Sequence, residues 1–344
     1  MHKESLPVIN IVYKQLAAIV FLILIHGCTP KQELQTTTPA IALPQKQSYE
    51  YPLHALTGTY AQSLAVRHFI QQMVAKQGFE ESYLNDLFSQ AHRLQFVMRL
   101  ENAPLYQGTK SDKPKPGSWS RYRRKFVDTA HINNGVTFWS VNAEAIQQAS
   151  NTYNVDPEYI VAIIGVETFF GRNMGDTCTF DALTTLAFDT QRRSSFFKQE
   201  LEHFLLMARE EGYKPLEPVG SWAGAMGFGQ FMPSSFRRLA VDFNKDGQRN
   251  LWHQEDAIGS IAHYFSRHGW QFKQPIAERT LDDTNADTIM LGAQHGHEYW
   301  QTYPNFKVIK KYNNSNKYAM AVHQLAQAIK QQYYQAHLNL GYSK

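Results

Sequence analysis

One carboxylate stands on the apolar face of an otherwise hydrophobic segment, YIVAIIGVETFFGRNMG. Ile160, Ile163, Ile164 and Glu167 are spaced i, i+3, i+4 and i+7, so they share one face of a helix. Burial raises the pKa of a carboxyl group and keeps it protonated near neutral pH, which a general acid requires. Two structural alternatives stay open, an ion pair with Arg172 and a solvent-facing position near the helix end.

A second motif, VDFNKDGQRNLW, carries side-chain oxygens at alternate positions. Asp242, Asn244, Asp246 and Gly247 give the pattern D-x-N-x-D-G, which begins an EF-hand calcium loop. The twelfth position of that loop is His253, where a standard EF-hand has glutamate. The motif therefore predicts a structural cation site, with a loop of side-chain-stabilised turns and no ion as the alternative.

Helices must position these groups, because few segments of the chain alternate with period two. Asp156 and Pro157 form a helix start signal, with Asp as N-cap, for a helix that runs to about Phe170. A short strand is predicted at 305–311. Apolar spacing predicts further helices at 60–76, 80–90, 119–129, 142–150, 196–208, 257–267 and 318–331. The predicted fold class is therefore mainly α.

Composition excludes some classes of protein. The 344 residues allow two or three lobes, and the formal charge of +4 is too small to indicate nucleic-acid binding. The single basic cluster is RYRRK at 121–125. Two cysteines, Cys28 and Cys178, are too few for a disulfide framework, and Cys178 is expected to be a small buried residue.

The first 28 residues resemble a bacterial lipoprotein signal. Lys3 and Lys14 precede the apolar segment at 16–25, which is too short to span a bilayer comfortably, and Cys28 follows as the lipidation site. A plain signal peptide and an uncleaved anchor are the alternatives. Thr29 stands where aspartate would imply inner-membrane retention, so the resemblance implies an outer-membrane address. Residues 29–50 are predicted to be a flexible tether, because this Thr, Gln and Pro-rich stretch has little to bury.

Several long motifs occur in one order: IIGVETFFGRNMG, DALTTLAFD, RRSSFFKQELEHFLLMAREE, GSWAGAMGFGQFMPSSFRRLAVDFNKDGQRNLW, AIGSIAHYFSRHGW and YNNSNKYAMAVHQLAQAI. Together they resemble the membrane-bound lytic murein transglycosylases of the B type. The resemblance covers roughly residues 63–328 with gaps. It implies a lysozyme-like, α-rich core with a glycan groove, and Glu167 as the catalytic acid.

The implied reaction cleaves the β-1,4 bond between N-acetylmuramic acid and N-acetylglucosamine in peptidoglycan and leaves a 1,6-anhydro-muramoyl end. Glycosidases usually need two carboxylates. Asp176 and Asp181 are near Glu167 in sequence, but neither is convincing, and Asp181 is expected to cap the helix before ALTTLAF. A single acid suffices if it protonates the leaving oxygen and later accepts the proton of the attacking C6 hydroxyl. No cofactor is needed for this chemistry.

The resemblance also implies substrate-binding residues. All except Asn313 have a plainer structural reading: a turn residue for Ser221, a helix-start hydrogen bond for Gln230, a solvated face for the arginines, and core packing for the tyrosines. The implied set is Ser221, Gln230, Arg192, Arg193, Tyr122, Tyr264, Tyr312, Asn313 and Tyr318.

The same resemblance extends the cation loop. It implies a structural Ca²⁺ or Na⁺ site in the loop 242–256, with Gln248 contributing its main-chain carbonyl and Asp256 closing the ligand set. The segment 271–299 is shorter than the corresponding segment of the family and is predicted to form a small irregular or β-containing insert. The HGHE sequence within it is not a convincing zinc site.

The predicted organisation places the lysozyme-like catalytic core at 151–270. A helical lobe is predicted at 51–150, joined by the C-terminal segment 300–344. The predicted partners are peptidoglycan strands, outer-membrane lipid through an acylated Cys28, and cell-wall synthesis proteins. A soluble periplasmic protein is the alternative location. A hydrolytic muramidase on the same scaffold and a non-catalytic peptidoglycan-binding scaffold are the alternative functions.

Overall fold

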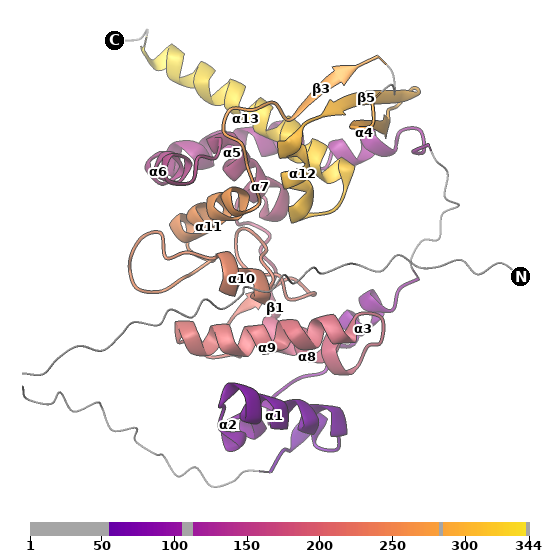
Figure 1. Ribbon diagram of the computed structural model, residues 1–344, viewed down its shortest axis with the longest axis vertical. Helices are drawn as coiled ribbons and strands as arrows, with labels where there is room; N and C mark the ends of the chain where they lie inside the picture. The colour runs from indigo at the N-terminus through magenta and orange to yellow at the C-terminus, as the bar shows by residue number, and fades with distance from the viewer. Residues whose placement is uncertain (1–54, 105–112, 282–284, 342–344) are drawn as a thin grey trace, which may run out of the picture. The chain divides into compact units, whose positions relative to one another are not determined.

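The computed structural model describes residues 55–104, 113–281 and 285–341 (Figure 1). Cys28, the leader and the tether lie outside the described residues. The described residues belong to one compact unit. In chain order its elements are η1 (Gly58–Tyr60), α1 (Leu64–Gln77), α2 (Glu81–Ser89), α3 (Gln95–Glu101), α4 (Ser118–Arg123), α5 (Thr129–Val141), α6 (Ala143–Tyr153), α7 (Pro157–Thr168), β1 (Thr177–Cys178), α8 (Thr179–Phe188), α9 (Ser194–Glu211), β2 (Val219–Gly220), α10 (Pro233–Leu239), α11 (Gln254–Arg267), β3 (Ala277–Thr280), β4 (Thr288–Gly292), β5 (His297–Thr302), α12 (Pro304–Tyr312) and α13 (Asn316–Gly341).

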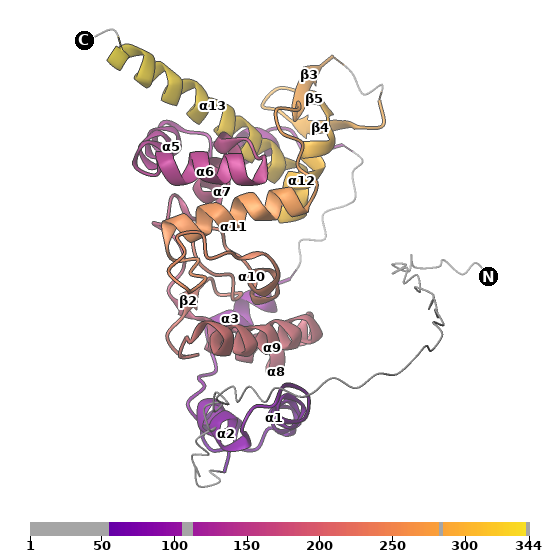
Figure 2. The same cartoon turned by 60° about the vertical axis from the view of Figure 1, so that its left-hand side comes forward.

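Helix α7 carries the acid and is packed on several sides. It contacts α5, α6, α11 and α13 (Figure 2). All its residues except Pro157 and Glu167 are buried. The predicted helix start is confirmed, with Asp156 at the N-cap position and Pro157 first in the helix, but the Asp156 side chain makes no capping hydrogen bond. Its carboxylate instead accepts hydrogen bonds from Trp270 Nε1 at 2.9 Å and from the Lys273 main-chain N–H. These donors come from a distant segment, which a local capping pattern does not reveal.

Most predicted helices are confirmed, with three differences. The predicted helix 119–129 is two helices, because α4 ends at Arg123 and the Asp128 carboxylate caps α5 by accepting the His131 N–H at 2.8 Å. The short helix α3 was not predicted. The predicted strand at 305–311 is wrong and is helix α12, begun by Pro304 at its first position. Seven residues are too few for apolar spacing to distinguish a helix from a strand.

The predicted helical lobe of 51–150 with 300–344 makes contacts in two directions. Helices α4 and α5 do pack against α13. The segment 55–104 packs instead near α8 and α9. The Tyr60 hydroxyl donates to Asp189 at 2.6 Å, and the Gln77 amide donates to Glu202 of α9 at 2.7 Å. Helix α3 contacts α8. Phe88 also meets Phe180 edge-to-face. Phe69 of α1 and Phe88 of α2 both pack against Phe188 of α8, so burial divides this segment.

The region of the predicted insert is β-containing. Strands β3, β5 and β4 form an antiparallel sheet in that order, with Ala277 opposite Thr302 and Gly292 opposite His297. A two-residue pairing of β1 with β2 links the segment after α7 to the segment before α10. The sheet extends to Thr302, three residues beyond the predicted insert.

Candidate active site

Glu167 lies in the last turn of α7, half-buried beside the C-terminal helices. The Tyr318 hydroxyl, from the first turn of α13, donates to Glu167 Oε1 at 2.5 Å. Burial raises the pKa of the Glu167 carboxyl to about 7, and the Tyr318 hydrogen bond opposes this shift. Arg172, the alternative partner, has its guanidinium 5.2 Å from the Phe169 ring centre. The acid is therefore poised to be protonated near neutral pH and to lose its proton readily.

Two further tyrosines lie within the electrostatic reach of this acid. The Glu167 charge adds to burial in raising the pKa values of Tyr122 and Tyr312. The Tyr312 hydroxyl donates to the Gly229 carbonyl at 2.6 Å, and its ring centre lies 4.6 Å from that of Tyr264. The four predicted tyrosines are therefore linked to the acid in different ways. Tyr318 bonds it, the Glu167 charge acts on Tyr122 of α4 and on Tyr312, and Tyr264 packs on Tyr312.

The segment between β2 and α10 forms another side of the site. The Thr168 hydroxyl, next to the acid, donates to the Phe228 carbonyl at 3.1 Å and so ties the end of α7 to this segment. Gln230 has a left-handed backbone with φ of 50°, and its amide nitrogen donates to the carbonyls of Met174 and Gly227. The alternative role for Gln230 as a helix-start hydrogen bond is wrong, since α10 begins only at Pro233.

A cavity of about 480 Å³ is lined by Gly171–Asp176, the segment that follows the acid. Gln230 contacts one wall of this cavity through the Met174 carbonyl. The Ser221 hydroxyl oxygen accepts the N–H groups of Ala223 and Ala225 at 3.3 and 3.0 Å, which matches its alternative reading as a turn residue. Asn313 is exposed just after the end of α12.

Neither candidate for a second carboxylate is placed to join Glu167. Asp176 is exposed, and Asp181 accepts the His92 main-chain N–H at 2.9 Å. The predicted capping role of Asp181 is wrong, because α8 already begins at Thr179. No carboxylate among the described residues shifts the pKa of Glu167. Within the described residues, Glu167 is therefore the one carboxyl group that the geometry brings to the Tyr318 hydroxyl.

Arg192 and Arg193 share one carboxylate that sequence reasoning missed. Both guanidinium groups bond Glu101, whose side chain is fully buried at 0% exposure. The hydrogen bond from Arg193 is the main reason that the Glu101 pKa falls to about 2. The predicted alternative of a freely solvated arginine face is wrong. Glu101 ends a short helix with no regular apolar spacing, so the sequence held no signal for it.

The cation-like loop is closed by its own side chains. The N–H of Asp246 donates to Asp242 Oδ1 and Asn244 Oδ1 at 3.1 and 3.0 Å, and Asp242 Oδ2 accepts the Gly247 N–H. Asp256 is fully buried, and its oxygens accept the N–H groups of Phe243, Asn244 and Asn250. The side-chain oxygens at 242, 244 and 246 suit a hard cation, whereas Asp256 already holds the loop backbone.

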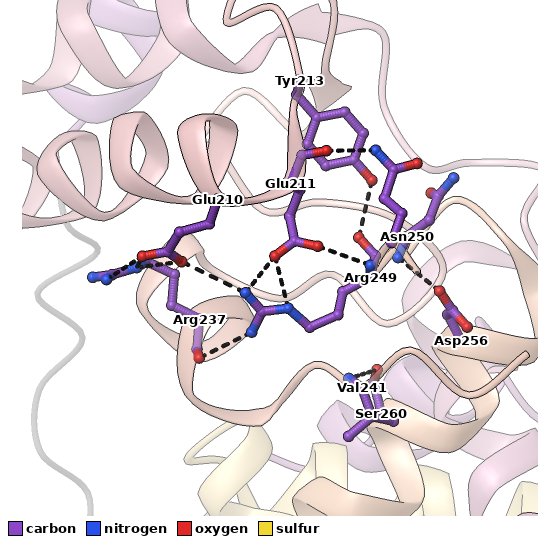
Figure 3. Close-up of polar contacts among 10 residues, drawn as sticks. Glu210, Glu211, Tyr213, Arg237, Val241, Arg249, Asn250, Asp256 and Ser260 are labelled. Carbon is purple, nitrogen blue, oxygen red and sulfur yellow. Dashed lines mark hydrogen bonds and ion pairs between the residues drawn. The ribbon is translucent and has the colours of Figure 1, made fainter. Parts of the chain in front are cut away.

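Ion pairs anchor the end of this loop to α9 (Figure 3). Arg249 bonds Glu211 through Nε at 2.8 Å, and the Tyr213 hydroxyl donates to the Arg249 carbonyl at 3.0 Å. Arg249 also pairs with Glu210 at 3.5 Å, and Arg237 of α10 bonds the same carboxylate at 2.6 Å. No group of three His, Cys, Asp or Glu side chains able to hold a metal occurs in the part of the chain that the structure describes. A cation here would therefore depend on the Asn244 oxygen or on main-chain carbonyls.

A helical core with one half-buried acid, a tyrosine on that acid and further aromatic rings beside it defines a single-acid, lysozyme-like glycan-cleaving enzyme. The model of the transglycosylase SLT domain family matches residues 61–281 and 277–327. The chain belongs to this family, and the predicted resemblance is confirmed.

Characterised relatives agree with this assignment. The membrane-bound lytic murein transglycosylase B of Escherichia coli strain K12 is 40% identical over 342 residues, which cover 89% of this chain and 95% of the relative. The structure of the E. coli lytic transglycosylase Slt35 in complex with calcium is 40% identical, with a TM-score of 0.75 over 83% of this chain and 98% of that one. The soluble lytic transglycosylase SltB1 of Pseudomonas aeruginosa is also 40% identical, with a TM-score of 0.72 over 78% and 98% of the two chains.

Proposed function

We propose that this protein is a peptidoglycan lytic transglycosylase in which Glu167 acts first as the acid and then as the base. The observation that carries the proposal is the single carboxyl group with a pKa of about 7 under the Tyr318 hydroxyl. A group that titrates near the working pH both gives and takes a proton efficiently. Without a second carboxylate to activate water, an internal nucleophile of the substrate accounts for the second step.

The proposed reaction has two proton transfers, and the Glu167 carboxyl group takes part in both. Protonated Glu167 gives its proton to the glycosidic oxygen as the bond from that oxygen to C1 of the muramic acid breaks. The resulting carboxylate then accepts the proton of the C6 hydroxyl as that oxygen bonds to C1, which closes the 1,6-anhydro ring and restores the acid. The Tyr318 hydroxyl stabilises the carboxylate between the two steps, since hydrogen bonding favours the charged form. The substrate's own acetamido group stabilises the cationic intermediate.

The remaining predicted residues are proposed to bind the glycan around this acid. Tyr122 and Tyr312 are partly exposed and are proposed to stack on sugars, whereas Tyr264 is buried against His268 and Tyr312 and supports the Tyr312 ring. Polar contacts are proposed for Ser221, Gln230, Asn313 and Tyr318. The side chains of Arg192 and Arg193 are 32% and 47% exposed, and the N–H groups that Glu101 and the Ala103 carbonyl do not engage are proposed to bind a substrate carboxylate.

Product chemistry tests the function. Purified sacculi are digested with the enzyme, and the released muropeptides are separated and weighed. Anhydro ends, lighter by one water than reducing ends, are the expected product. Reducing ends would identify a hydrolytic muramidase, and no release of fragments would favour a binding scaffold.

Calcium is proposed to bind the loop 242–256 and to stabilise the fold without taking part in the chemistry. The support is the set of oxygens at Asp242, Asn244 and Asp246 and the calcium complex of a related structure. Calcium at 100 times its Kd is expected to stabilise the folded protein by roughly 2.7 kcal/mol, seen as a rise in Tm. Asp246→Asn should abolish most of that rise, whereas the distant Asp287→Asn should keep it. An equal rise in both variants, or with Mg²⁺ as with Ca²⁺, would contradict the assignment.

The enzyme is proposed to be anchored to the outer membrane through acylated Cys28. Within the described ranges, no helix is long and apolar enough to cross a membrane. The relative from E. coli is named as membrane-bound. Cys28→Ser is expected to move the protein from the membrane fraction to the soluble periplasmic fraction, with Cys178→Ser as the control. Membrane retention of Cys28→Ser would show that the leader itself is the anchor.

A further inference from the structure

Helices α7 and α13 pack side by side and are joined by polar contacts at both ends of α7 (Figures 1 and 2). At the C-terminal end, Tyr318 meets Glu167. At the N-terminal end, the Tyr159 hydroxyl lies 2.8 Å from His323 Nδ1. The partners run in opposite directions along the two helices, so the pair is antiparallel and these contacts define its register.

The N-terminal contacts form a connected set. The Gln327 amide nitrogen donates to the Tyr159 hydroxyl at 3.1 Å, and Lys330 Nζ bonds Glu158 Oε1 at 2.7 Å. Tyr159 and Glu158 are both only 3% exposed. Because the Tyr159 oxygen accepts from Gln327, its own hydrogen is free to be donated to an unprotonated His323 Nδ1. Burial lowers the pKa of His323 to about 4, which keeps this acceptor neutral at physiological pH.

A buried polar group that loses its partner is costly, so this set resists sliding of one helix along the other. Each residue of an α-helix advances about 1.5 Å along the axis. A slip of one residue would therefore take the Tyr318 hydroxyl out of hydrogen-bond range of Glu167. The segment between the two ends is apolar, with Ile163, Val322 and Leu325 fully buried, and because apolar burial is non-directional, the polar groups at the ends supply the directional contacts of this pair.

We propose that Tyr159, with His323, Gln327 and the Glu158–Lys330 ion pair, is a positioning residue that sets the register of α13 on α7 and so holds the Tyr318 hydroxyl on Glu167. The inference rests on the proposed role of Glu167 only for its effect on rate. Its effect on the titration of Glu167 is independent of that role.

The titration of Glu167 is a direct readout of this register. The Tyr318 hydrogen bond lowers the Glu167 pKa, so weakening it must raise that pKa further. The groups facing Glu167 from the other helices are Tyr122 on α4 and Tyr312 on α12, and burial raises the pKa values of both above the ordinary value of 10.0. None of the facing tyrosines therefore titrates between pH 5 and 9, where Glu167 does.

The experiment compares four full-length variants with the wild type: Tyr159→Phe, Tyr318→Phe, the double variant and Gln332→Ala. Tyr159→Phe removes the hydroxyl but keeps the ring that packs 4.9 Å from Trp270. Gln332→Ala is the matched control, because it removes a contact from α13 to Asn133 on α5 and none to α7. The Glu167 carboxyl is titrated by carbon-13 NMR in each, and the alkaline limb of the pH–rate profile and Tm are recorded.

Tyr318→Phe is expected to raise the Glu167 pKa by roughly one unit, the worth of one hydrogen bond to a charged group. Tyr159→Phe should raise it by part of that amount and lower kcat with little change in KM. In the double variant, Tyr159→Phe should add nothing to the effect of Tyr318→Phe. Gln332→Ala should match the wild type.

An unchanged Glu167 titration in Tyr159→Phe, with only a lower Tm, would overturn the proposal and leave Tyr159 a structural residue. If Tyr159→Phe shifts the Glu167 pKa by the same amount with and without the Tyr318 hydroxyl, the proposal is also overturned. If Tyr159→Phe does not fold, Lys330→Met is measured instead, because it removes the Glu158 ion pair of the same contact set. Lys330→Arg keeps that ion pair and should leave the Glu167 pKa at the wild-type value. Anhydro products missing from the wild type would defeat the proposed function but leave the titration result intact.

Discussion

Replacing Glu167 by glutamine is expected to lower the rate of sacculus digestion by roughly 10² to 10⁴-fold, the usual contribution of a positioned acid or base. Glutamine keeps the size of the side chain and a carbonyl oxygen for Tyr318, but it can neither give nor accept the proton. Fragment release from purified sacculi measures the loss. The exposed Glu217→Gln should retain full activity, since its carboxylate only pairs with Lys214 on the surface. Full activity in Glu167→Gln would remove the acid assignment.

The same substitution should make the fold more stable at alkaline pH. The pKa of Glu167 is raised from 4.5 to about 7 in the folded state, so the folded protein holds a proton that the unfolded chain releases between these values. Stability of the wild type therefore falls as pH rises through that window and stays lower above it. Glutamine has no such loss. The Tm of Glu167→Gln should exceed that of the wild type at pH 8, and this difference should shrink towards pH 4.5.

Replacing both Arg192 and Arg193 by methionine is expected to reduce the free energy of unfolding by about 3–5 kcal/mol, the usual cost of leaving a buried charge unpaired. Glu101 is fully buried and both arginines bond it, with Arg193 first among the causes that lower its pKa to about 2. A carboxylate with a depressed folded pKa stabilises the fold above its ordinary pKa, and this contribution is lost as pH falls towards 2. Urea unfolding at pH 7 measures the loss.

A third substitution separates this structural role from substrate binding. Glu101→Met, added to the two methionines, removes the unpaired charge and should recover most of the lost stability. If the arginines also bind a substrate carboxylate, as proposed, the stable triple variant will still show a raised KM on sacculi. If KM is unchanged in that variant, the single role of the two arginines is to pair with Glu101. Lysine at both positions should retain part of the stability, because it keeps the charge but lacks the bidentate geometry.

The order and type of the main elements could be predicted because the signals are local. The apolar spacing before Glu167 predicts a helix with an acid on a buried face, and α7 is that helix. Gly78 and Gly269, with φ of 66° and 90°, end helices where the sequence places them. The long motifs identified the family because many residues at fixed spacing are specific where one residue is not. The D-x-N-x-D-G pattern predicts a cation site with side-chain-stabilised turns as the alternative; the turn hydrogen bonds are present, and the cation stays a prediction.

The partners of the polar side chains could not be predicted, because they come from distant parts of the chain. Asp156 is placed to cap α7, yet it bonds Trp270 from a segment more than a hundred residues later. Arg192 and Arg193 look like free surface charge until Glu101 is seen beneath them. The sequence by itself therefore determined most of the helices, the place of Glu167 on a buried helix and the family, since backbone propensity and apolar periodicity act over a few residues. Only the tertiary structure decided which group holds that acid and which charges are buried, because desolvation and hydrogen bonding depend on residues that the fold brings together.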